Sequence, residues 1–386
     1  MKLLHLADLH LGRSLNEFDL IDDQRYILEQ ILGLVGEHEV DGVLIAGDVY
    51  DRTVPSEAAV NLLDDFLNRL SEKAVPVYMV SGNHDSDDRL NFGSRLFTAR
   101  GIHIAAKYRG ELVKETLVKD GEEVDIWLLP FVKSSHVKHY YPDEQIEDYQ
   151  AAVQVALAHA DINTSRCNLL VAHQFVAGKG NQNPELGGSE SARTRSVGTV
   201  ERIGYEVFDD FDYVALGHIH RPQSIGRDEV RYSGSPLKYS LSEEPIAKTV
   251  PLITIEKNAV ASVELLPLTP KRDLRHLKGP LKELLDPENV SDTEDFIYVT
   301  LTDDELIDDV MTIVQQTYPN TIKIDYDNVH SQTAELTDIT AVTMDRPFAE
   351  LIQEFYQMMY GTEITEEEMA IMREVAGEAG VPDETD

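Results

Sequence analysis

The chain has 386 residues, and its 34 lysines and arginines against 70 aspartates and glutamates give a formal net charge of −36. This length allows one sizeable domain with one or two small ones, and no apolar stretch reaches the roughly 18 residues of a membrane-spanning helix. Asp8 and His10 interrupt the opening apolar run and Cys167 is the single cysteine, so we expect a cytoplasmic protein without signal peptide or internal disulfide.

Five short apolar runs, each followed at once by polar residues, predict strands that are buried on both faces. Helices are expected between the first runs, from about Asp22 to Glu37 and again after Pro55 and Ser56, because apolar residues recur there with helical spacing. Strands that alternate with helices in this way make right-handed crossovers and lie parallel. The five runs are 3–7, 42–46, 77–80, 169–172 and 213–216.

Residues 101–131 change this rhythm and predict three short strands, at 102–104, 111–118 and 124–129, in a second sheet stacked on the first. The segment from Phe131 to Tyr141 then mixes lysines and histidines with aromatic residues. Such mixing is typical of a nucleic-acid contact, although a solvated loop would have the same composition. The same two interpretations apply to Arg193 and Arg195 in a loop rich in glycine and serine.

The end of the chain predicts a smaller fold of its own. A strand at 296–301, a helix at 303–318 and a strand at 321–326 form an α/β unit. Two helices follow, and the second opens with a capping box between Thr365 and Glu368. Their apolar faces either fold back on the small unit or bind a partner helix. These faces comprise Phe348, Leu351, Ile352, Phe355 and Met359 in the first helix, and Met369, Met372 and Val375 in the second.

Potential metal ligands follow each of the five buried strands, at the end where α/β sheets bind ligands. They supply carboxylate, amide oxygen and imidazole without thiolate, a set that favours manganese or iron over structural zinc. Each short motif is weak alone, whereas all of them in order predict a site for two ions that share a carboxylate. The histidine in the first run, His5, is expected to be a packed core residue. The seven ligands are Asp8, His10, Asp48, Asn83, His173, His218 and His220.

The order and spacing of these motifs resemble a known signature. Asp8-x-His10, Gly47-Asp48-x-x-Asp51, Gly82-Asn83-His84-Asp85, His173 and Gly217-His218-x-His220 are similar to the motifs of calcineurin-like metallophosphoesterases. Within that superfamily, residues 5–12, 189–193 and 232–240 resemble the bacterial SbcD-type nucleases. The resemblance implies a four-layer α/β/β/α sandwich over 1–270 and an α/β capping domain over 271–340. A helical partner-binding segment over 341–378 and an acidic tail over 379–386 would follow.

The resemblance also implies a function and a distribution of roles. It implies manganese-dependent two-metal hydrolysis, with 3′–5′ exonuclease action on double-stranded ends and endonuclease action on hairpins and blocked ends. Asp8, His10 and His220 would hold one ion, Asn83, His173 and His218 the other, and Asp48 would bridge them. His84 would stabilise the phosphate or protonate the leaving oxygen. Asp51, where archaeal and eukaryotic relatives carry histidine, would orient His84 or His10.

Partners and alternatives follow from the same features. The resemblance implies that helices over 346–377 bind an SbcC-type ATPase, with a homodimer inside a heterotetramer. The acidic net charge indicates that this partner supplies most of the affinity for DNA. One alternative is a stand-alone phosphoesterase that acts on nucleotides or phosphoproteins without an ATPase. Another is a binding subunit with a vestigial site, which the complete ligand set disfavours.

Overall fold

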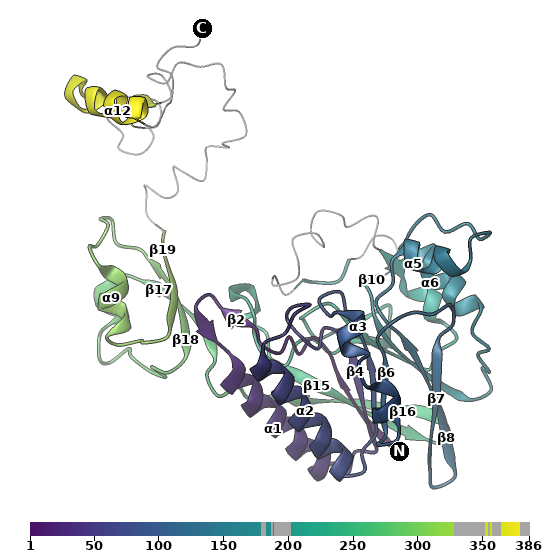
Figure 1. Cartoon of the computed structure of the whole chain (residues 1–386). Helices are drawn as coiled ribbons and strands as arrows, with labels where there is room; N and C mark the ends of the chain where they lie inside the picture. The colour runs from purple at the N-terminus through teal and green to yellow at the C-terminus, as the bar shows by residue number, and fades with distance from the viewer. Residues whose placement is uncertain are drawn as a thin grey trace. The chain divides into compact units, whose positions relative to one another are not determined.

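The computed structural model describes residues 1–178, 183–186, 188, 202–327, 352–353, 356 and 364–378. The chain divides into two compact units, Met1–Leu274 and Arg275–Asp386, and each is described by itself (Figure 1). Among the described residues, no helix has the length and hydropathy needed to cross a membrane. The expected contacts at Arg193 and Arg195 and the acidic tail lie outside the described residues.

The first unit contains a mixed six-stranded sheet built around the first three predicted strands. Strands β1, β4, β5 and β6 are parallel neighbours, and β15 continues the sheet antiparallel to β1. Every residue of β4 and β5 is buried, as expected for strands covered on both faces. In sheet order the strands are β16 (Ala259–Pro267), β15 (Thr249–Glu256), β1 (Lys2–Leu6), β4 (Gly42–Ala46), β5 (Val77–Val80) and β6 (Ile102–Ala105).

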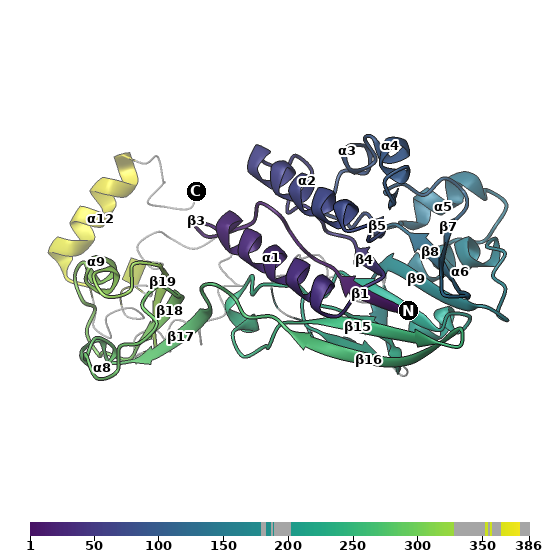
Figure 2. The same ribbon diagram turned by 90° about the horizontal axis from the view of Figure 1, so that it is seen from below.

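Helices α1 (Ile21–Glu37) and α2 (Glu57–Glu72) cover the outer face of this sheet (Figure 2). Both were predicted from their apolar spacing and both are confirmed. Ser56 begins α2 by accepting a hydrogen bond from the backbone N–H of Ala59. Two short helices, α3 (Asp87–Leu90) and α4 (Ser94–Thr98), lie between β5 and β6 in the sequence.

A second mixed six-stranded sheet contains the other two predicted strands, β9 and β12. Strands β8, β9, β12 and β14 are parallel neighbours, whereas β7 and β13 are antiparallel edge strands. In sheet order the strands are β13 (Gln223–Ile225), β14 (Arg227–Tyr232), β12 (Tyr213–Gly217), β9 (Cys167–His173), β8 (Glu122–Leu129) and β7 (Val113–Lys119).

The two sheets pack face to face over one apolar core. Leu44 and Val80 of the first sheet and Val171 and Ala215 of the second belong to this inner cluster, all fully buried. A separate cluster joins the outer face of the second sheet to α5 (Ser134–Tyr140), α6 (Tyr149–Ala158) and a 3-10 turn, Tyr205–Phe208. The layers are therefore helix, sheet, sheet and helix, and the predicted α/β/β/α sandwich is confirmed.

Two details differ from the sequence-based expectation. The strand predicted at 102–104 is β6, which pairs in parallel with β5 and so closes the first sheet instead of opening the second. The segment from Phe131 to Tyr141 is not a loop, because α5 occupies most of it and buries Val137. His5 and Cys167 are fully buried, as expected of core residues.

The second unit has a three-stranded sheet in the order β17 (Leu274–Gly279), β18 (Phe296–Leu301) and β19 (Thr321–Tyr326). The predicted strand, helix and strand are confirmed, and the two strands, β18 and β19, are parallel. Helix α9 (Val310–Gln315) is much shorter than the predicted 303–318. The first residues of the predicted range 303–318 are acidic and do not join the helix. The carboxylate of Asp303 instead accepts a hydrogen bond from the N–H of Leu281, the first residue of α8 (Leu281–Leu284).

Helix α12 (Glu366–Glu378) is the second of the two predicted C-terminal helices. Its capping box is confirmed, since Thr365 Oγ1 accepts from the Glu368 N–H while the Glu368 carboxylate accepts from the Thr365 N–H at 2.9 Å. Met369 is buried, but Val375 is 57% exposed, so the expectation that it points inward was wrong. Most of the first helix, with Phe348, Leu351, Phe355 and Met359, lies outside the described residues.

Candidate metal centre

The seven expected ligands lie at the carboxyl ends of β1, β4, β5, β9 and β12, so both sheets contribute. His173 is the last residue of β9, and the other six are in the loops that follow their strands. The two sheets meet directly at this edge, where the Nδ1–H of His173 donates to the carbonyl of Ala46 at 2.8 Å. The site therefore lies where the carboxyl ends of the parallel strands of two stacked sheets converge.

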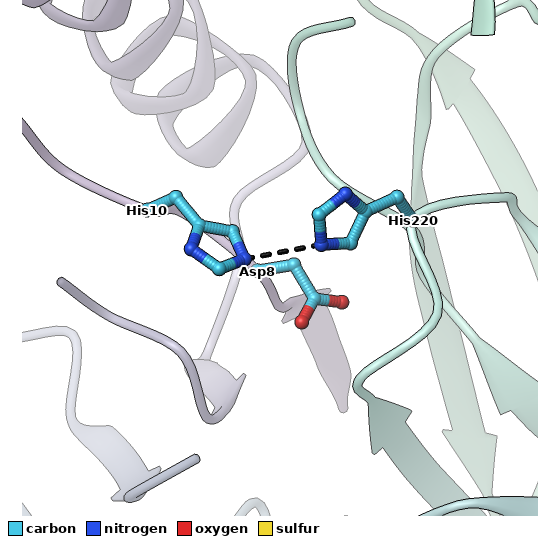
Figure 3. A group of neighbouring side chains, drawn as sticks. All are labelled: Asp8, His10 and His220. Carbon is cyan, nitrogen blue, oxygen red and sulfur yellow. Dashed lines mark hydrogen bonds between the residues drawn. The ribbon is translucent and has the colours of Figure 1, made fainter. Parts of the chain in front are cut away.

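One cluster contains Asp8, His10 and His220, all nearly or fully buried (Figure 3). The Nε2 atoms of the two imidazoles face each other at 3.0 Å. One ligand atom from each of the three residues lies within 4.8 Å of the others. This is the separation expected of side chains that bind one ion.

A second cluster contains Asn83, His173 and His218. The amide oxygen of Asn83 lies 2.8 Å from Nδ1 of His218 and 3.1 Å from Nε2 of His173. Because Nδ1 of His173 already donates to a backbone carbonyl, its Nε2 is the atom available to a metal ion. The Nε2 atom of His218 is buried and has no hydrogen-bond partner among the described residues.

Asp48 lies between the two clusters. Its Oδ2 is 3.5 Å from Nε2 of His10 in the first cluster and 3.4 Å from Nε2 of His173 in the second. Its Oδ1 accepts a hydrogen bond from the backbone N–H of His84 at 2.9 Å, which fixes the carboxylate. One carboxylate is thus within reach of two ions, which is the arrangement a dinuclear centre requires.

The backbone around the ligands is strained. Four of the seven ligand residues have positive φ, 52° at Asp8, 43° at His10, 47° at Asp48 and 102° at His218. Residues other than glycine seldom adopt this region, and such strain gathers at functional sites where surrounding structure imposes it. Here the loops after β1 and β4 are bonded to each other, with the His10 N–H donating to the Asp48 carbonyl at 2.9 Å.

Two glycines allow the loops to approach this closely. A Cβ at Gly82 would lie 2.1 Å from Oδ1 of Asp48, and one at Gly217 would lie 1.9 Å from the carbonyl oxygen of Ala46. Both distances are far inside van der Waals contact. The absence of a side chain is therefore required at Gly82 for two loops of the first sheet to meet, and at Gly217 for the second sheet to approach the first.

Burial and neighbouring charges shift the pKa values of the ligand histidines in two opposite directions. Burial lowers the pKa of His10 to about 4 and that of His218 to about 3, so both carry free lone pairs at neutral pH. Burial also opposes protonation of His173, but the nearby Asp48 outweighs it and raises the pKa of His173 to about 9. Despite burial, the same pairing holds the pKa of Asp48 well below its usual range. A proton on His173 thus balances charge that a metal ion would otherwise balance.

The donor set fits divalent cations. Two facing imidazole nitrogens 3.0 Å apart can share only one proton when the rings are neutral, whereas a cation satisfies both lone pairs. The surrounding oxygens belong to carboxylates and an amide, and thiolate is absent from the cluster, which favours manganese, iron or a similar ion. Asp48 thus lies between two groups of imidazoles that suit metal ions, one joined by the carboxylate of Asp8 and the other by the amide oxygen of Asn83.

Asp51 and His84 lie beside the first cluster. The Nδ1–H of His84 donates to the backbone carbonyl of Asp51 at 3.0 Å, and the His84 ring meets that of His10 edge to face. The carboxylate of Asp51 lies 3.5 Å from Nδ1 of His10 and 3.1 Å from the guanidinium of Arg13. Asp51 thus touches both histidines, one through its side chain and one through its backbone.

Three further residues hold the loops, and sequence analysis gave none of them a role. The carboxylate of Asp85 accepts from the backbone N–H groups of Val49, Tyr50 and Gly82. Its place in the Gly82-Asn83-His84-Asp85 motif was a signal that could have found it. Gln24 donates to the carbonyl of His10 at 2.7 Å, and the hydroxyl of Tyr239 donates to the carbonyl of Leu9 at 2.6 Å. No local pattern links these two residues to the site.

Comparison with known proteins adds the following similarities. Residues 1–222 match the calcineurin-like phosphoesterase family, and residues 270–360 match a family described as the type 5 capsule protein repressor C-terminal domain. The chain is 35% identical over 328 residues to the SbcD component of nuclease SbcCD from Staphylococcus epidermidis, covering 84% of this chain and 85% of that protein. A dimetal phosphatase structure from Danio rerio aligns with 12% identity and a TM-score of 0.38, over 70% of this chain and 98% of that one.

Proposed function

The chain belongs to the calcineurin-like phosphoesterases, and we propose that it is a DNA nuclease subunit that uses two divalent ions, with manganese as the native metal. The relative that is 35% identical confirms the resemblance to SbcD-type nucleases and the enzyme class, a metal-dependent phosphoesterase. The observation that carries the proposal is the position of Asp48, whose Oδ2 lies within 3.5 Å of a histidine in each cluster.

We propose that Asp8, His10 and His220 hold one ion and that Asn83, His173 and His218 hold the other. When bound, two such ions would supply positive charge to a phosphodiester and lower the pKa of water. Buried protein groups hold the ligands in place. Asp85 and Gln24 fix the ligand loops through backbone hydrogen bonds, so the donor atoms are arranged before substrate arrives.

His84 is proposed as the group that acts on the substrate. Its Nδ1–H is held by the Asp51 carbonyl, which can only accept, so Nε2 is the atom that it can present to a phosphate. In its cationic form, His84 would stabilise negative charge on the phosphate or give the proton at Nε2 to the leaving oxygen. Asp51 would orient the ring through its carbonyl.

The proposed substrates are double-stranded DNA ends for 3′–5′ exonuclease cleavage, and hairpins or blocked ends for endonuclease cleavage. Phe131 begins the segment beside the site, with its ring 6.3 Å from that of His173, and the exposed Lys133 and Lys138 follow it. These residues could meet a DNA backbone at the rim of the site. With a net charge of −36, however, we expect a partner chain to supply most of the affinity for DNA.

That partner is proposed to be an SbcC-type ATPase bound by the helical segment 346–377. Helix α12 presents Ile371 and Val375, which are 60% and 57% exposed and lie on one face of the helix because they are four residues apart. An exposed apolar face on a capped helix suits a groove on a partner. The match of residues 270–360 to a second family supports a role for this part of the chain beyond a stand-alone phosphoesterase.

A homodimer within the complex is proposed from a second apolar surface. Phe92, between α3 and α4, is 82% exposed, and Leu96 and Phe97 of α4 are 77% and 37% exposed. Large apolar side chains that gather on a surface commonly mark an interaction site. This surface belongs to the first unit, whereas α12 belongs to the second.

A nuclease assay tests the function. The full chain should cleave hairpin DNA with Mn²⁺, more rapidly when the ATPase partner and ATP are added. Asp48→Asn should lower the rate about a thousandfold or more, since metal ions contribute several kcal/mol to the stabilisation of the transition state.

Equal turnover of nucleotides or phosphopeptides without the partner would favour the stand-alone phosphoesterase instead. DNA-end recruitment retained in an Asp48→Asn variant, with a wild type that cleaves nothing, would indicate a binding subunit.

A further inference from the structure

A buried ion pair lies behind His220, on the side away from His10. Glu243 is fully buried and Lys248 is 5% exposed, and the Lys248 ammonium lies 2.6 Å from Oε2 of Glu243. Removing two charges from water costs several kcal/mol each, so a buried ion pair is weak evidence for stability by itself. A role at the neighbouring ligand would account for the retention of this pair.

The ammonium group of Lys248 is saturated by contacts that converge on His220. It donates to the carboxylate of Glu243, to the hydroxyl of Ser235 at 2.8 Å and to the backbone carbonyl of His220 at 2.9 Å. An ammonium has three donors, and all three are used. Lys248 therefore fixes both the carboxylate and the backbone of the ligand residue.

The carboxylate of Glu243 approaches the His220 imidazole on its Nδ1 side, opposite the nitrogen that faces His10. Oε1 of Glu243 lies 3.7 Å from Nδ1 of His220, while Nε2 of the same ring faces His10 at 3.0 Å. The first distance exceeds that of a hydrogen bond, so the carboxylate acts on the ring through its negative charge. A carboxylate at one nitrogen orients a ligand imidazole and raises the basicity of the other nitrogen.

The two clusters differ in the groups that lie beside the Nδ1 atoms of their histidines. In the first, each imidazole has a carboxylate on its Nδ1 side, Asp51 at 3.5 Å for His10 and Glu243 at 3.7 Å for His220. In the second, Nδ1 of His173 donates to the neutral carbonyl of Ala46 at 2.8 Å, and the carboxylate nearest to this atom, that of Asp8 at 3.9 Å, belongs to an expected ligand. Removing the charge of Glu243 should therefore affect one ion and spare the other.

We propose that Glu243, held by Lys248, is a positioning residue for His220 and selectively strengthens the ion site formed by Asp8, His10 and His220. This inference rests on the proposed two-ion centre and adds a residue to it. Within the part of the chain that the structure describes, the carboxylate of Glu243 contacts Lys248, Ser235, Ser240 and His220, and His220 belongs to the first cluster.

Calorimetric titration of the metal-free full chain with Mn²⁺ tests the proposal. Glu243→Gln should weaken one of the two binding events about 10- to 100-fold and leave the other unchanged. Glu244→Gln is the matched control, since it removes the same charge from the next residue and should leave both affinities unchanged. Equal Mn²⁺ affinities for both ions in Glu243→Gln and in the wild type would overturn the proposal.

A second variant serves as the control for folding, because Glu243→Gln leaves the Lys248 ammonium buried without its counterion. Glu243→Gln/Lys248→Met removes both charges and should fold, with the same selective loss of Mn²⁺ affinity. A double variant that binds both ions like the wild type would show that the pair is only structural. A wild type that binds fewer than two ions or leaves DNA uncut would instead contradict the proposed function, so the two failures are distinguishable.

Discussion

The Nε2 atoms of His10 and His220 lie 3.0 Å apart, although 210 positions separate these residues in the sequence. His10 follows a strand of the first sheet and His220 follows a strand of the second, so their contact depends on how the two sheets are stacked. Two buried imidazoles with facing nitrogens have only one shared proton between them when neutral. A divalent cation satisfies both, which is why this pair indicates metal chemistry.

Replacing His84 by alanine should separate metal binding from turnover. We expect both ions to bind as in the wild type, since His84 is not one of the seven expected ligands and its side chain touches them only by an edge-to-face ring contact with His10. The cleavage rate should fall about 10²- to 10⁴-fold, the usual contribution of a general acid or base. Manganese binding by calorimetry and single-turnover cleavage of hairpin DNA measure the two effects. His38→Ala, at the end of α1, is the control; cleavage at the wild-type rate in His84→Ala would remove the role.

A methyl group at position 82 should disrupt the centre from within. In Gly82→Ala the new Cβ would meet the Asp48 carboxylate at 2.1 Å, so the loop or the carboxylate must move. We expect loss of Mn²⁺ binding and a fall of about 1–3 kcal/mol in the free energy of unfolding, as for other overpacked sites. Chemical denaturation of the metal-free protein measures this change.

Gly33→Ala provides the matched control for that substitution. Gly33 lies in α1, and a Cβ there would meet no atom within 4 Å. Alanine is the better helix former by roughly 0.5–1 kcal/mol, so this variant should be as stable as the wild type or more stable. Normal metal binding in Gly82→Ala would mean that the close approach to Asp48 is not required.

Metal binding should release a proton from His173. In the metal-free protein its pKa is raised to about 9 by Asp48, against the effect of burial, so the ring is protonated at pH 7. A metal ligand must be deprotonated, and the affinity for the ion should therefore rise with pH and level off above about 9. Calorimetry at pH 7 in buffers of different ionisation enthalpy measures the protons released.

A matched variant assigns that proton. His173→Gln should abolish the proton release on metal binding, because the glutamine amide does not titrate in this pH range. Proton release of the same size in His173→Gln would assign the proton to another group, and affinity independent of pH between 7 and 9 would contradict the prediction.

A charge on the exposed face of α12 should weaken partner binding and little else. Ile371 is 60% exposed, so Ile371→Glu removes few packing contacts, and the unfolding temperature should change by no more than a few degrees. The affinity for the ATPase partner should fall about tenfold or more, the effect of about 1.4 kcal/mol. Ala370→Glu adds the same charge to an exposed neighbour that faces another direction. Similar losses in both variants would indicate a general charge effect instead of a specific face.

The sequence predicted much of the fold because its signals are local. Runs such as 42–46 and 77–80 contain only residues that suit a buried strand, and they became β4 and β5 at those bounds. The capping box of Thr365 and Glu368 is complete within four residues and formed as expected. Where the signal was ambiguous, as in the mixed lysine, histidine and aromatic segment that became α5, composition alone did not distinguish helix from loop.

The sequence by itself determined the chemistry of this protein. It specified which side chains follow the buried strands and that they are carboxylates, an amide and imidazoles, because these properties belong to single residues and their immediate neighbours. That information was enough to expect two ions and a shared aspartate.

Only the tertiary structure decided which side chains meet. It divided the five strands between two sheets, placed Asp48 between His10 and His173, and brought Glu243 and Lys248 behind His220. These contacts arise from the stacking of two sheets over a common apolar core and from loops held in left-handed conformations. Such packing depends on many distant residues at once, so no local pattern encodes it.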